Sequence, residues 1–157
     1  MPQTSTAPPS SAPLSATELD AWRGMLQVHA KVTAALDAEM QAEHGFPAST
    51  YEVLMFLGNA PGHRLRMAEI ADRVLLTRSG CTRLVDRLVK LGFVERSSTP
   101  EDGRGFFATL TPAGVEKLES ARETHYRGVR SQFLAGLSVA DQLVLADVWK
   151  RALASGD

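Results

Sequence analysis

The chain has 157 residues, of which 44% are apolar, 22% charged and 6% aromatic, and its formal net charge is −1. This length and composition predict one compact core rather than two. The single cysteine, Cys81, excludes an intrachain disulfide framework and fits a reducing compartment. No segment approaches the roughly 20 apolar residues of a membrane span, and the first residues lack the pattern of a secretory leader, so we expect a cytoplasmic protein without a membrane partner.

Charge is unevenly distributed along the chain. Residues 62–105 carry nine Arg and Lys against six Asp and Glu, a net charge of +3, and the remaining residues carry −4. Electrostatic binding depends on a local surface rather than on the total charge, so the middle of the chain is suited to a polyanion. An ordinary solvated surface would give the same charge count, so the charge alone does not distinguish it from a surface that binds a polyanion.

The first 14 residues are predicted to form a flexible arm, because residues 1–13 contain too few large apolar groups to offset the entropy of ordering them. Ser15 and Glu18 then form an S-x-x-E capping box. Apolar residues recur after it with helical spacing, which predicts one long amphipathic helix that ends near Gly45.

A second, shorter helix is expected after this long one. Ser49 and Glu52 form another S-x-x-E pattern, which predicts that the helix begins there. Gly58 and the Pro61-Gly62 pair are expected to stop it. A brief extended segment should follow over residues 65–67.

The next two predicted helices lie close together. Apolar spacing predicts a helix over residues 67–74, and Thr77 is positioned to cap a further helix that Gly92 ends. Apolar residues at spacings of three and four form one stripe on this helix. They are Cys81, Leu84, Val85, Leu88 and Leu91.

A β-hairpin follows directly. Residues 93–98 and 106–110 are rich in strand formers, and the seven residues between them have turn chemistry. The hairpin should therefore carry a polar tip.

Two helices are expected to complete the chain. Thr111-Pro112 supplies a cap and a first-turn proline for a helix that runs to about residue 135, where Gly136 closes it. Ser138 caps the last helix, which carries Asp141 in its first turn. The predicted fold class is mainly α with a small β-hairpin: a winged helix-turn-helix unit and a helical region built from the terminal helices.

The helix before the hairpin leaves one face free of the apolar stripe. Arg side chains can contact guanine, Ser and Thr can contact base edges or phosphates, and a hairpin arginine between glycines suits a narrow minor groove. The hairpin directly after the helix favours double-stranded DNA as the partner. The candidate DNA-binding residues are Arg78, Ser79, Thr82, Arg83 and Arg87 on the helix, and Arg104 with Asp102, which could orient it, in the hairpin.

Several segments together resemble the MarR family of bacterial regulators. The resemblance covers nearly the whole chain after the arm. It implies an obligate homodimer held by the first and last helices, a winged helix in each lobe, a pseudo-palindromic operator, and repression that is usually relieved by a small aromatic ligand or by cysteine oxidation. The segments that carry it are residues 66–72, 77–88, 92–96, 102–104 and 110–114.

Domain boundaries follow from these elements. Residues 15–46 and 112–157 are expected to form the dimerisation region, and residues 47–111 the DNA-binding region. The first helix and the last two are too long for a small winged-helix core to cover their apolar faces. We therefore expect these faces to pack against a partner surface, most simply a second copy of the chain.

An effector site is expected in the crevice between the two regions. Trp22, Met25 and His29 on the first helix, with Tyr51 and Met55 on the second, would give an apolar and aromatic wall that suits a flat aromatic acid or phenol. The alternative is that Trp22 and Met25 fill the dimer core, since such residues at helical spacing usually pack.

Other functions are weaker on the sequence. Cys81 falls on the apolar stripe, so it is interpreted as core packing rather than a redox switch. The four histidines are not at ligand spacings, no phosphate-cradling glycine loop occurs, and no nucleophile and base group together, so we expect no metal, no cofactor and no enzyme activity. A winged-helix adaptor that acts through protein contact would need apolar anchors where Arg78, Ser79, Thr82 and Arg83 stand.

Overall fold

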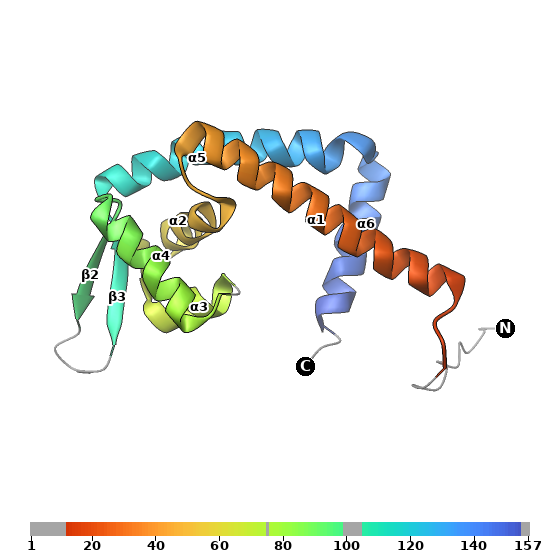
Figure 1. The fold of residues 1–157 in the computed structure, drawn as a ribbon, viewed down its shortest axis with the longest axis horizontal. Helices are drawn as coiled ribbons and strands as arrows, with labels where there is room; N and C mark the ends of the chain where they lie inside the picture. The colour runs from red at the N-terminus through yellow and green to blue at the C-terminus, as the bar shows by residue number, and fades with distance from the viewer. Residues whose placement is uncertain (1–11, 75, 99–104, 155–157) are drawn as a thin grey trace.

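A computed structural model describes residues 12–74, 76–98 and 105–154 of the chain. The described part holds six α-helices and three strands in the predicted order, with two short 3₁₀ turns, η1 and η2. In Figure 1, α5 runs along the top of the molecule and α1 slopes down from beside it, with the small sheet, α3 and α4 below one end of α5 and α6 descending from the other end. Residues 1–11 of the expected arm lie outside the described residues. No helix within the described ranges is long and apolar enough to cross a membrane.

The long first helix, α1 (Ala16–His44), begins and ends as the sequence predicts. The Ser15 hydroxyl accepts the Glu18 N–H at 3.3 Å, and the Glu18 carboxylate accepts the Ser15 N–H at 2.8 Å, which confirms the capping box. Gly45 ends the helix at φ 74°, a left-handed conformation that glycine adopts without strain.

The predicted start of α2 (Ala48–Asn59) is wrong. The helix begins one residue before Ser49, with Pro47 as its N-cap, so Ser49 lies inside the first turn and cannot cap it. The Asp37 carboxylate of α1 instead accepts the Ala48 N–H at 2.8 Å, which supplies the cap from a neighbouring helix.

Gly58 does not stop α2 but lies within it. A Cβ at Gly58 would stand 2.3 Å from Leu118 Cδ2 of α5 (Pro112–Gln132), so this glycine lets the two helices pack closely. Five residues of α2 are buried: Thr50, Tyr51, Val53, Leu54 and Leu57.

The small sheet has three strands rather than the two of a hairpin. The expected extended segment is a strand, β1 (Arg64–Arg66), which pairs antiparallel with β3 (Phe106–Leu110), and β3 pairs with β2 (Val94–Ser98). Its middle residue Leu65 lies opposite Ala108, and both are buried against the helices. The strand thereby closes the sheet over the core.

The two central helices are α3 (Met67–Arg73) and α4 (Arg78–Lys90). Thr77 caps α4 as predicted, accepting the Gly80 N–H at 3.1 Å. Cys81, Val85 and Leu88 of the predicted stripe are buried. Leu91 is not: it is the C-cap residue, where the chain turns towards Gly92, and half of its surface is exposed.

The start of α5 is fastened to the end of α4. Thr111 caps α5 by accepting the Gly114 N–H at 3.0 Å, and its hydroxyl donates to the Gly92 carbonyl at 2.6 Å. The Thr111 N–H donates to the Phe93 carbonyl at 3.1 Å. These contacts fix the wing, which begins just after Phe93, relative to the long helix.

Polar contacts join the other side of α5 to α1. Thr124 accepts from His44 Nε2 at 2.9 Å and donates to the Glu43 carboxylate at 2.8 Å, and Arg127 pairs with Glu43. Burial lowers the pKa of His44, which favours the neutral ring in this contact. These contacts hold the two long helices together.

The last helix, α6 (Val139–Ala154), begins with the predicted cap. Ser138 accepts the Asp141 N–H at 3.2 Å, and Asp141 accepts the Ser138 N–H at 2.9 Å. The preceding helix ends at Gln132, three residues before the expected end, and η2 (Leu134–Gly136) makes the turn. None of the residues of α6 is buried.

Candidate DNA interface

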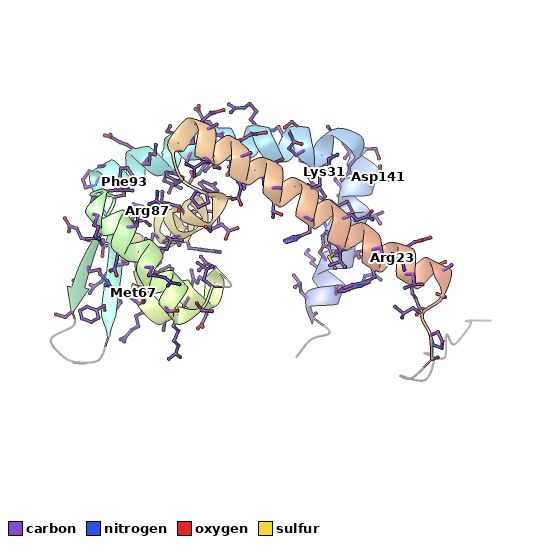
Figure 2. All side chains as sticks on the ribbon, viewed as in Figure 1. Arg23, Lys31, Met67, Arg87, Phe93 and Asp141 are labelled. Carbon is purple, nitrogen blue, oxygen red and sulfur yellow. The ribbon has the colours of Figure 1, made fainter. Side chains whose placement is uncertain are left out.

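The face of α4 opposite its buried stripe is exposed and cationic. Because Cys81, Val85 and Leu88 fix one side of the helix in the core, the helical period turns the other side to solvent. Figure 2 labels Arg87 on this helix. The predicted contact residues Arg78, Ser79, Thr82, Arg83 and Arg87 are all exposed.

The two hydroxyl residues of this face already have partners. Thr82 Oγ1 donates to the Arg78 carbonyl at 2.9 Å, a bond back to the preceding turn of the helix. Ser79 Oγ lies 3.3 Å from Thr77 Oγ1. The arginines therefore supply the long donors of this surface.

Asp86 belongs to a link between α4 and the wing. Its carboxylate pairs with Arg96 of β2 at 2.6 Å, and the Arg96 guanidinium lies over the Phe106 ring of β3, 5.4 Å from the centroid. The sequence alone does not reveal this pair, because the partner Arg96 lies on a strand ten residues further along the chain. This link holds the hairpin beside the helix.

Two further arginines, which sequence reasoning missed, lie on the wing sheet. Arg64 and Arg66 of β1 stack over the Phe107 ring at 3.9 and 5.0 Å from its centroid. The alternation Arg64-Leu65-Arg66, with the leucine buried and an arginine on each side of it, is the sequence signal that could have identified these two residues. Asp102 and Arg104, the predicted wing contacts, lie outside the described residues.

Cys81 is a buried packing residue, as predicted. Its side chain is 1% exposed, and burial raises the pKa of the thiol, which disfavours the reactive thiolate. Among the residues that the structure describes, no three His, Cys, Asp or Glu side chains gather into a group that could hold a metal ion.

The five predicted effector residues do not form one wall. Trp22, Met25 and His29 line an apolar groove of about 910 Å³ between α1 and α6, whereas Tyr51 and Met55 are absent from its lining. Ala48, the first residue of α2, is bonded to Asp37, which lies 15 residues along α1 from Trp22, a rise of roughly 22 Å. The length of α1 therefore separates the two halves of the predicted site.

Tyr51 occupies the core instead. It is 1% exposed, and its ring stacks on His125 of α5 with the centroids 4.5 Å apart. Burial raises the pKa of Tyr51 and lowers that of His125, so both are neutral near pH 7. Met55 is partly buried against the same core.

The apolar side chains of α6 face outward. The exposed fractions of Leu143 and Leu153 are 69% and 81%, and Val139, Val144 and Trp149 are also exposed. Trp149 and Val148 line the groove together with Trp22 of α1. The rest of the described chain leaves these apolar side chains uncovered.

Comparison with known proteins identifies relatives across the whole fold. A model of the MarR family matches residues 44–105. An uncharacterized HTH-type transcriptional regulator of Bacillus subtilis, YkoM, is 33% identical over 110 residues, which are 70% of this chain and 70% of YkoM. The crystal structure of Sco3205, a MarR family transcriptional regulator from Streptomyces coelicolor in complex with DNA, is 34% identical, with a TM-score of 0.84 over 94% of this chain and 92% of that one. AbsC, a MarR family regulator from the same organism, is 29% identical, with a TM-score of 0.83 over 92% and 97% of the two chains.

Proposed function

The chain belongs to the MarR family of DNA-binding transcription regulators, and from this premise we propose that it acts as a homodimeric repressor on a pseudo-palindromic operator. The observation that carries the proposal is the exposed arginine face of α4, held beside a wing by Asp86 and Arg96. An adaptor would need apolar anchors on this face. Because the partner is DNA, we place the protein in the cytoplasm, and regulation of this kind requires no catalysis.

Dimerisation is supported by α6 and the groove beside it. A helix with no buried residue gains little from its own chain, so a second copy is the economical cover for its apolar side chains. We propose residues 15–46 and 112–157 as the dimerisation region and residues 47–111 as the DNA-binding region.

The groove between α1 and α6 has two candidate occupants. Its apolar lining suits both the helices of a second copy and a flat aromatic effector. We favour the second copy, because α6 forms one wall and would remain exposed around a small molecule. The effector proposal is thereby reduced to Trp22, Met25 and His29, which lie on the groove.

In the proposed complex, α4 lies in the major groove and the wing tip reaches the adjacent minor groove. The exposed arginines of α4 suit guanine edges and phosphates. Arg64 and Arg66 add positive charge on the sheet beside the wing. Each subunit would contact one half of the operator.

The direct test is binding to duplex DNA at several salt concentrations. We expect affinity to fall by at least a hundredfold between roughly 50 and 200 mM salt, because arginine contacts release counterions from the phosphates. DNase protection should cover two half-sites about one helical turn apart. An affinity that does not change with salt concentration, or DNase protection of a single unsymmetrical stretch of DNA, would contradict the proposal.

Two arginine substitutions should fail in different ways. Arg83→Ala, on the helix, should cost about 1 to 3 kcal/mol of binding free energy and relax sequence preference at one base pair of each half-site. Arg104→Ala, at the wing tip, should weaken binding more evenly and depend on the A·T content beneath it. Affinities on a panel of single-base operator variants distinguish the two patterns, and a uniform loss for both substitutions would refute this division.

A further inference from the structure

A small hollow lies between α3 and α4, beside the amino-terminal half of the proposed recognition helix. Its volume is about 210 Å³, and it is lined by Met67, Ala68 and Ala71 of α3 and by Arg78 and Thr82 of α4. Met67 is labelled in Figure 2. Since Arg78, Thr82 and Ala68 are exposed, the hollow opens to the same side as the arginine face of α4.

The polar atom that Thr82 could offer is already bonded. Its hydroxyl hydrogen is donated to the Arg78 carbonyl at 2.9 Å, so towards DNA the hydroxyl can only accept, and neither a phosphate nor thymine O4 offers it a hydrogen. Thr82 also carries a methyl group, and it lines the hollow together with Met67, Ala68 and Ala71. The hollow is therefore lined by apolar groups, with one guanidinium on its rim.

This lining matches one feature of the DNA major groove. Three of the four bases present only hydrogen-bonding atoms there, whereas thymine also presents its C5 methyl group. Alanine and the methyl of threonine are the small side chains that contact this group in protein–DNA complexes. A phosphate would instead require several donors, and Arg78 is the one side chain of the lining that has them.

We propose that this hollow receives the methyl group of a thymine in each half of the operator, and that Thr82 and Ala68 thereby select thymine at that position. The inference rests on the proposed function, because it assumes that α4 enters the major groove. It changes the role of Thr82 from a hydrogen-bonding residue to an apolar one.

Deoxyuridine provides the test, because it pairs as thymidine does and lacks only the methyl group. A duplex is first selected from a random-sequence library by the full-length protein, and each thymidine is then replaced by deoxyuridine, symmetrically in both half-sites. We expect one position at which affinity falls about fourfold per half-site, or about 15-fold for both, from the loss of one buried methyl contact. The other positions should change by less than about twofold.

Two substitutions of Thr82 separate its methyl from its hydroxyl. Thr82→Ser removes the methyl and should lower the preference for thymidine over deoxyuridine at the sensitive position. Thr82→Val keeps a methyl and removes the hydroxyl, and it should retain that preference. The opposite ranking would show that the hydroxyl reads the base, and it would overturn the proposal.

Filling the hollow gives an independent check. Ala68→Leu should abolish the preference, because the larger side chain occupies the hollow. If the protein selects a duplex but no thymidine responds to replacement, or if the preference survives Ala68→Leu, this inference fails and the proposed function stands. If no duplex is selected at all, the proposed function itself fails.

Discussion

A variant in which Leu143 and Leu153 are both replaced by Asp is expected to be monomeric at roughly micromolar concentration and to lose operator binding. Both side chains are more than two-thirds exposed in the single chain, so the substitutions remove no contact from its own core. In a symmetric dimer each substitution is present in both subunits. Burying one leucine side chain contributes about 1.5 to 3 kcal/mol to the free energy of association. We therefore expect the dissociation constant of the dimer to rise by at least a thousandfold.

Sedimentation measures the assembly state of this variant, and chemical denaturation measures its fold. Leu91→Asp is a matched control, because Leu91 is also half-exposed but lies at the end of α4, remote from α6; it should remain dimeric. DNA affinity should fall by more than a hundredfold in the double variant, since a monomer engages only one half-site. A double variant that stays dimeric would place the interface elsewhere.

Most element boundaries could be predicted because their signals are local. The caps at Ser15, Thr77 and Ser138 each bond to a group three residues along the chain, so the sequence pattern contains the whole contact. The start of α2 could not be predicted in this way. Its cap comes from Asp37, eleven residues earlier on another helix, and Ser49 and Glu52 only imitate the pattern.

The same distinction separates the two parts of the candidate site. The exposed face of α4 follows from the helical period alone, so the sequence could place its five candidate residues on one exposed face. The effector wall required knowing where two helices cross. The sequence contains the 15-residue spacing between Trp22 and Asp37, and the helical rise converts it into a distance. It does not show that α2 contacts α1 at Asp37, and that contact is what places Tyr51 well away from Trp22.

Gly114, like Gly58, is a glycine whose role became clear only in three dimensions. Gly114→Ala is expected to destabilise the protein by at least about 3 kcal/mol, at the upper end of the cost of overpacking. A Cβ at this position would stand 2.0 Å from the Phe93 carbonyl oxygen and 3.0 Å from its carbon, and these are backbone atoms that cannot rotate away. The same carbonyl accepts the Thr111 N–H, so any shift that relieves the clash also breaks the fastening between α4 and α5.

Thermal and chemical unfolding at one protein concentration measure this loss, which corresponds to a fall in Tm of about 10 °C for a chain of this size. Gly136→Ala is the matched control: a Cβ there meets nothing within 4 Å, and stability should stay within about 0.5 kcal/mol of the parent. Because the wing begins just after Phe93, Gly114→Ala should also weaken operator binding at temperatures where the protein is still folded. Equal stability of the two variants would mean that the turn after α4 relaxes freely, and that Thr111 and Gly114 do not set the position of the wing.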